Sequence, residues 1–163
     1  MTKIPTPFLQ DDLRVVPAWV DENGHMNVAF YLKCFDDAFY GVYRVWGMDF
    51  AEVHARGYST FAAQSNLSYL GELLLDDPFS IETRLVEFDR KRIRWFMTMH
   101  KADGSIAATC EWLLLFMNIH ARKVQEMPDH LFEELARIKS AHDTLPLPPQ
   151  LGRGISLSNK KPV

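Results

Sequence analysis

The feature that most constrains this sequence is one long apolar-periodic run that is followed by four extended segments. Between Val28 and Trp46 the apolar residues recur every three or four positions, which predicts a helix with one continuous apolar stripe. Asn27 is placed to cap the start of this helix, and Gly47 is placed to end it. After Gly57 the sequence becomes rich in aromatic and β-branched residues, which favour strands. The predicted strands are 58–70, 79–88, 93–101 and 106–119.

Short polar stretches separate these four strands, and such tight connections predict an antiparallel meander. A further strand is expected at 13–20, after a loosely structured start at residues 1–12. Residues 50–56 are expected to form a short helix, and residues 128–142 a final helix. This order predicts an α+β fold in which an antiparallel sheet wraps around one long central helix.

The length of 163 residues and the apolar share of 47% fit one domain with a sizeable core. We expect this domain to cover residues 1–143. Residues 144–163 hold four of the nine prolines and are expected to form a poorly ordered tail. The net charge of −3 offers no basic field for nucleic acid or an anionic membrane. No export signal and no apolar run of about 18 residues is found, so we expect no membrane partner.

The two cysteines, Cys34 and Cys110, each lie in an apolar run. This favours reduced, buried thiols in a cytoplasmic protein over a disulfide framework. The histidines show no zinc-type spacing to cysteines or carboxylates, so no metal site is predicted. Neither a glycine-rich phosphate loop nor a Gly-x-Ser-x-Gly motif occurs, which argues against nucleotide hydrolases and serine esterases.

The turn before the long helix brings a carboxylate, an imidazole and two carboxamides into seven positions, at Asp21, Asn23, His25 and Asn27, with Glu22 as a further acid. An acid beside a helix N-terminus can act as a nucleophile or as a general base toward water, while the backbone N–H groups of the first turn polarise an acyl carbonyl. This is a chemistry for acyl transfer without a serine. Asp, Asn and Gly are also ordinary turn residues, so a purely structural turn is the alternative.

The string 21–27, preceded by Pro17 and followed by Tyr31, Leu32 and Phe35, resembles the signature of hot-dog acyl-CoA thioesterases of the 4-hydroxybenzoyl-CoA thioesterase type. In element order the resemblance runs from about residue 15 to residue 118. More loosely, Gly57 with its following strand and residues 68–72 and 100–104 resemble the branch that includes betainyl-CoA thioesterases. The resemblance implies a hot-dog fold.

The resemblance also implies roles for individual residues. It places the catalytic carboxylate at Asp21 and the helix N-terminal amide that holds the thioester oxygen near Val28. Asp21, Asn23 and His25 are similar to the Asp-x-Asn-x-His turn of plant-type acyl-ACP thioesterases, in which all three positions take part in hydrolysis. His25 and Asn27 stand where the 4-hydroxybenzoyl type has apolar residues, which favours a shared catalytic role for His25.

The same resemblance implies a homodimer or a dimer of dimers with the acyl pocket at the subunit seam. It implies no metal and no cofactor apart from the coenzyme A of the substrate. Asn27 and Tyr31, close to the helix start, are predicted to contact the substrate.

The basic residues Arg90, Lys91 and Arg92 could hold the phosphates of coenzyme A, with a solvated hairpin as the alternative. Some of the aromatic side chains could form a cage for a quaternary ammonium acyl group, although core packing explains most of them. The predicted function is hydrolysis of a small to medium acyl-CoA to free acid and CoA, with betainyl-CoA or a related polar acyl-CoA as candidate substrate. The alternatives are a non-catalytic hot-dog protein that binds acyl thioesters and a hot-dog hydratase or dehydratase.

Overall fold

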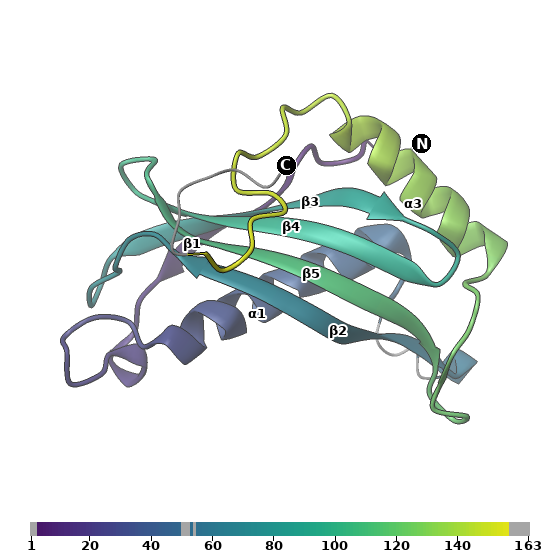
Figure 1. Cartoon of the computed structure of the whole chain (residues 1–163), viewed down its shortest axis with the longest axis horizontal. Coiled ribbons are helices and arrows are strands. Elements are labelled where there is room, and N and C mark those ends of the chain that lie inside the picture. The colour runs from purple at the N-terminus through teal and green to yellow at the C-terminus, as the bar shows by residue number, and fades with distance from the viewer. Residues whose placement is uncertain (1–2, 50–52, 54, 157–163) are drawn as a thin grey trace.

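The computed structural model of the protein describes residues 3–49, 53 and 55–156, and shows one curved antiparallel sheet with the helix α1 (Val28–Trp46) laid along one of its faces (Figure 1). The strands follow the order β1-β3-β4-β5-β2, and β6 pairs with β5. Their bounds are β1 Phe8–Arg14, β2 Tyr58–Tyr69, β3 Pro78–Phe88, β4 Arg92–Lys101, β5 Ile106–Asn118 and β6 Lys123–Val124. The predicted α+β hot-dog architecture, a sheet wrapped around a long helix, is confirmed.

The helix α1 has the bounds and the caps that the sequence predicts. The Asn27 side chain accepts a hydrogen bond from the Ala29 N–H, and Gly47 ends the helix in the left-handed conformation at φ 81°. One face of α1 is buried against the sheet, where the ring of Phe39 lies 5.2 Å from that of Trp95 and 5.5 Å from that of Trp112. The other face of α1 stays open. The buried residues of α1 are Tyr31, Cys34, Phe35, Ala38, Phe39, Val42 and Trp46.

The meander prediction holds for only three of the four strands. β3, β4 and β5 are consecutive neighbours, but β2 pairs with β5 instead of β3 and forms the far edge of the sheet. The connection from β2 to β3, residues 70–77 (the crossing segment), passes beside the start of α1, where the Tyr31 hydroxyl contacts Gly71 and Leu73. Leu73 in this connection is buried, and its carbonyl accepts a hydrogen bond from the Met26 N–H at 2.7 Å. The crossing segment is thereby joined to the turn before α1.

The predicted strand at 13–20 and the loose start at 1–12 are wrong, because the first strand lies closer to the N-terminus. β1 pairs with β3 and buries Phe8. The acidic residues fall in a bulge of this edge strand, with Asp12 at φ 55°, so their charges stay in solvent. The following segment forms η1, Pro17–Trp19, whose first position suits proline because no N–H is needed there.

The final helix, α3 (Asp129–His142), agrees with the prediction and covers the part of β3 that β1 leaves free. The ring Nδ1 of His142 accepts a hydrogen bond from the Leu85 N–H at 2.9 Å. In a sheet, the carbonyl of a neighbouring strand would take this place. At its other end, α3 contacts α1, since the Leu131 carbonyl accepts a hydrogen bond from Trp46 Nε1 at 3.0 Å. The short helix predicted at 50–56 falls mostly outside the described residues.

The described part of the predicted tail, residues 144–156, has no helix or strand but lies against the face of the sheet opposite α1 (Figure 1). The Arg84 guanidinium donates hydrogen bonds to the carbonyls of His142 and Leu145 at 3.2 and 3.4 Å. The Gly152 N–H donates to Glu111 Oε2 at 2.8 Å. These contacts attach the segment to β3 and β5, which its composition alone did not indicate.

Candidate active site

The turn before α1 is held by short-range hydrogen bonds around Asp21. Its Oδ1 accepts from the Asn23 N–H at 2.9 Å, and its backbone carbonyl accepts from the Gly24 N–H at 3.0 Å. Gly24 has φ 82°, a conformation that favours glycine and lets the chain reverse within three residues. The Asp21 N–H donates to the His25 carbonyl at 3.1 Å. The turn therefore fixes the carboxylate of Asp21 relative to its own backbone.

Asn27 joins this carboxylate to the helix. Its Nδ2 donates to Asp21 Oδ2 at 3.2 Å, while its Oδ1 accepts from the Ala29 N–H at 3.0 Å. Its backbone N–H donates to the Trp19 carbonyl at 2.8 Å, which anchors the turn to η1. One carboxamide thus caps the helix and orients the acid at the same time.

The N–H of Val28, the first helical residue, has no acceptor within the described part of the chain, and this residue is 54% exposed. The first N–H groups of a helix lack internal partners and carry the positive end of the helix dipole. Such a group can bind an oxyanion. The structure therefore brings an acid and an open amide to the same end of α1, with Asn27 between them.

His25 is half-buried, and its Nδ1 lies 3.3 Å from the Met26 carbonyl. Within the described residues, no hydrogen bond joins its ring to the Asp21 carboxylate. The backbone of His25 forms an isolated bridge with Leu74 of the crossing segment. The structure therefore does not pair the imidazole with the acid, and a catalytic role for His25 stays a prediction.

Tyr31 is buried, and its hydroxyl is held by the β2 to β3 connection. The hydroxyl accepts from the Leu73 N–H at 3.1 Å and donates to the Gly71 carbonyl at 3.4 Å. Burial raises the pKa of Tyr31, in keeping with a neutral phenol. These contacts give Tyr31 a role in holding the crossing segment, and its predicted contact with substrate stays a prediction.

Tyr69, which the sequence analysis did not place at the helix start, lies next to this end of α1. Its hydroxyl donates to the Val28 carbonyl at 3.1 Å, and its ring meets that of Tyr31 edge to face, with centroids 5.3 Å apart. The contact fixes the first turn of α1 relative to the end of β2. Tyr69 is 41 positions away from Val28 in the sequence, so only the pairing of strands could reveal it.

The predicted phosphate site at Arg90, Lys91 and Arg92 lies at the opposite end of the sheet from the turn. Tyr69, which contacts Val28, pairs with Ala108 on β5, whereas Arg92 pairs with Leu115. Seven positions along a strand correspond to about 23 Å. A single chain therefore does not bring the basic residues to the Asp21 turn.

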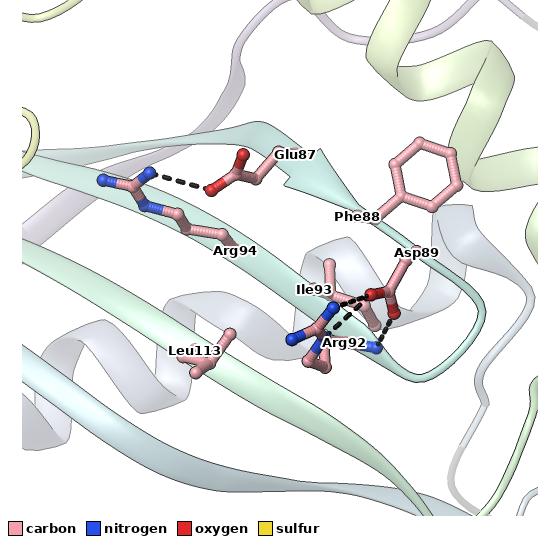
Figure 2. Close-up of a pocket in the computed structure, with 7 residues that line it drawn as sticks. All are labelled: Glu87, Phe88, Asp89, Arg92, Ile93, Arg94 and Leu113. Carbon is pink, nitrogen blue, oxygen red and sulfur yellow. Dashed lines mark hydrogen bonds and ion pairs between the residues drawn. The ribbon is translucent and has the colours of Figure 1, made fainter.

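Each of these three cations also has an acidic partner. Arg92 binds Asp89 across the shallow pocket of Figure 2, which lowers the pKa of the Asp89 carboxyl. Arg90 pairs with Asp129, and Lys91 Nζ lies 3.6 Å from Glu126. A phosphate contact at this hairpin would need a second subunit and stays a prediction.

A groove runs from the first turn of α1 along its open face toward β2 and has a volume of about 470 Å³. This volume is in the range of small-molecule sites. Its lining residues are Ala29, Leu32, Lys33, Asp36 and Tyr43 of α1, Thr60, Ala62 and Ser65 of β2, and Trp112 and Leu114 of β5. Three of the α1 members, Ala29, Lys33 and Asp36, are spaced by four and three positions, so the sequence carried a second helical face that the analysis did not consider.

In the part of the chain that the structure describes, no group of three His, Cys, Asp or Glu side chains is arranged to hold a metal ion. No described helix is both long and apolar enough to span a bilayer.

The fold and the polar turn at the start of α1 together define a protein of the hot-dog thioesterase class. A family model described as the thioesterase-like superfamily matches residues 15–135, and the chain belongs to this superfamily. The predicted class of enzyme, a thioester hydrolase, is confirmed by this membership and by the names of the relatives.

Two curated relatives place the chain more closely. It is 30% identical to the betainyl-CoA thioesterase of Pseudomonas aeruginosa, over 88% of this chain and 91% of that protein. It is 34% identical, over 91% of its length, to the L-carnitine dehydrogenase/betainyl-CoA thioesterase of Rhizobium meliloti. The chain spans only about 30% of the length of that relative. The predicted resemblance to this branch is confirmed.

Solved structures share the fold. A hypothetical protein from Staphylococcus aureus in complex with CoA superposes with a TM-score of 0.88 at 28% identity, covering 97% of this chain and 99% of that one. The DHNA-CoA thioesterase from Staphylococcus aureus superposes with a TM-score of 0.77 at 14% identity, covering 85% of this chain and 94% of that one, and shows a common fold only.

Proposed function

We propose that this protein hydrolyses an acyl-CoA thioester to the free acid and CoA at the N-terminus of α1. The observation that carries the proposal is the Asp21 carboxylate held by Asn27 beside the open N–H of Val28. The carboxylate attacks the thioester carbon or activates water toward it, and the Val28 N–H stabilises the oxyanion that forms. The thiolate of CoA leaves and takes up a proton; where Asp21 has attacked the carbon, water then hydrolyses the acyl–Asp21 anhydride and releases the free acid. No cofactor beyond the substrate is required.

Asn23 and Asn27 act as positioning residues for this acid. The Asn23 backbone N–H and the Asn27 carboxamide each hold one of the two oxygens of Asp21. Because each donor fixes one oxygen, the two contacts hold the carboxylate in one orientation beside the helix end. His25 is half-buried, and its Nδ1 contacts the Met26 carbonyl whereas its Nε2 does not. We propose that Nε2 assists proton transfer to the leaving CoA thiolate or from the attacking water.

CoA as the carrier is supported by the structural neighbour that was solved in complex with CoA. A betainyl group as the acyl part is supported by two relatives, whose names both include betainyl-CoA thioesterase. We therefore propose a small, polar acyl-CoA of the betainyl type as the substrate.

The working form of the enzyme is proposed to be a homodimer or a dimer of dimers. β2 is a 12-residue edge strand, and Phe61 in its middle is 38% exposed, a combination that favours pairing with another chain. Such a pairing would place the groove between α1 and β2 next to the subunit seam. A reducing, cytoplasmic location is supported by Cys34 and Cys110, which are both free and buried.

The proposal is tested by release of free CoA from a panel of acyl-CoA thioesters. Asp21→Asn is expected to lower kcat at least about 1,000-fold, since it removes the attacking or proton-accepting group but keeps the side-chain volume. The neighbouring exposed acid provides the matched control, and Glu22→Gln should change kcat less than about twofold.

An unchanged rate in Asp21→Asn would remove Asp21 from the mechanism. Binding of the acyl-CoA without release of thiol by the wild-type protein would point to a non-catalytic binder. Formation of a 3-hydroxyacyl-CoA from an enoyl-CoA in the same panel would point to a hydratase.

A further inference from the structure

The groove between α1 and β2 begins at the proposed reaction centre and contains an acid that the proposed mechanism does not use. Ala29, next to Val28, lines its start, and Asp36 lies two turns further along α1. An acyl group whose thioester oxygen is bound at the Val28 N–H would extend into this groove. The groove therefore decides which acyl groups fit.

Asp36 forms no hydrogen bond or ion pair within the part of the chain that is described. The nearby Lys33 is engaged one position further on, because its Nζ binds the Asp37 carboxylate at 2.5 Å. Asp36 is exposed, and partial desolvation together with the charge of Asp37 raises the pKa of its carboxyl, while the charge of Lys33 opposes this effect. Lys33 lines the same groove but is bound to Asp37, so the Asp36 carboxylate has no salt-bridge partner among the described residues.

Two aromatic side chains, Tyr43 and Trp112, line the same groove as this acid. The side chain of Trp112 faces α1, since its ring packs against Phe39, and the residue is only 5% exposed. Tyr43 binds Thr60 through its hydroxyl, which fixes its ring on the same side. An acid with aromatic faces beside it is a combination that attracts organic cations.

We propose that Asp36 is the specificity residue for a positively charged acyl group, of which trimethylammonium is the fitting chemistry. The inference rests on the proposed thioesterase function and names the group that distinguishes its substrate. A quaternary ammonium group has no N–H to donate, so a carboxylate charge and aromatic faces are the means of recognising it.

The spacing along the helix is compatible with a short acyl chain. Asp36 follows Val28 by eight residues, which corresponds to about 12 Å along the axis. Its side chain leans back toward the N-terminus of α1, and this shortens the gap to the reacting carbonyl. A trimethylammonium group a few bonds from the thioester therefore lies in the groove between Val28 and Asp36, within range of the Asp36 charge.

The experiment compares betainyl-CoA with 3,3-dimethylbutanoyl-CoA, in which a carbon atom replaces the quaternary nitrogen and the shape is kept. The wild-type enzyme is expected to prefer betainyl-CoA by at least about tenfold in kcat/KM. Asp36→Asn should abolish this preference, with little change for the neutral thioester. The matched control is Glu133→Gln, which removes an exposed acid of α3 outside the groove, leaves the Lys33–Asp37 pair intact and should keep the preference.

Two results would overturn the proposal while leaving the thioesterase function intact. One is equal hydrolysis of both thioesters by the wild-type enzyme, and the other is an equal loss on both thioesters in Asp36→Asn. If the wild-type protein hydrolyses neither thioester, the proposed function fails and the cation site is judged by binding alone. Tetramethylammonium should then quench tryptophan fluorescence, more weakly in Asp36→Asn, and no binding or unchanged binding would refute the site.

Discussion

The two ends of α1 differ in how deeply their side chains are buried and in how many of their N–H groups have hydrogen-bond acceptors. At the C-terminal end Trp46 is fully buried, its indole N–H donates to the Leu131 carbonyl, and Gly47 closes the helix. At the N-terminal end Val28 is exposed and its N–H has no acceptor among the described residues. The C-terminal end of the helix is thus packed into the core, whereas the N-terminal end has an N–H group that can bind a ligand.

The largest expected effect is on the free energy of unfolding when a side chain is removed at each end of α1. Trp46→Ala should lower the free energy of unfolding by about 3–5 kcal/mol, because it opens a cavity and leaves the Leu131 carbonyl without its donor. At the open end, Leu32→Ala removes a side chain that is 39% exposed and should cost less than about 1 kcal/mol. Urea unfolding of both variants measures the difference. Similar losses at the two ends would contradict the comparison.

A second prediction separates capping from catalysis at the open end. Asn27→Ala should lower the free energy of unfolding by about 1 kcal/mol and kcat by about tenfold, since it removes both the cap and the donor to Asp21. Asn27→Ser keeps a short side-chain acceptor for the Ala29 N–H but has no amide to reach Asp21, so it should retain the stability and still lose about tenfold in kcat. Unfolding curves and CoA release give the two readings. Full activity in Asn27→Ser would show that the contact to Asp21 does not matter.

The smallest expected effect is a change in how the stability depends on pH, through the buried residue His142 at the end of α3. Burial lowers the pKa of His142, whose neutral ring accepts from the Leu85 N–H and contacts the Pro5 carbonyl through Nε2. In the unfolded chain this histidine has an ordinary pKa of about 6.5 and binds a proton more readily. Its contribution to stability is therefore complete above about pH 6.5 and is lost as the pH falls below that value.

The measurement is the urea midpoint at about pH 7.5 and about pH 5.5 in the wild-type protein and in His142→Gln. The Gln amide oxygen can still accept from the Leu85 N–H but does not titrate. We expect a smaller difference between the two midpoints in the variant. An equal difference in both proteins would assign the pH dependence to other groups.

The parts of the fold that the sequence predicted well depend on local rules. Asn27 and Gly47 bound α1 because capping involves neighbouring residues, and the long strands follow from residue type. The position of β2 beside β5 depends on contacts between distant segments, and local patterns do not encode it. The β1 prediction failed because a bulge takes acidic residues such as Asp12 out of the strand pairing.

The candidate site shows the same division. Asp21 and Val28 could be proposed together from the sequence because the turn and the helix start are adjacent in it. Tyr69 and the groove around Asp36 depend on β2 lying against α1, and the separation of the basic hairpin from the turn depends on the register of β5. Local sequence was enough to propose the reacting groups, whereas their surroundings required the tertiary structure.

The most direct test of the account is a crystal structure of the Asp21→Asn protein with an uncleaved acyl-CoA. The account predicts a thioester oxygen about 2.7–3.1 Å from the Val28 nitrogen and the carbonyl carbon within reach of the side chain at position 21. A thioester bound away from the N-terminus of α1, in a protein that retains its fold, would contradict the central claim.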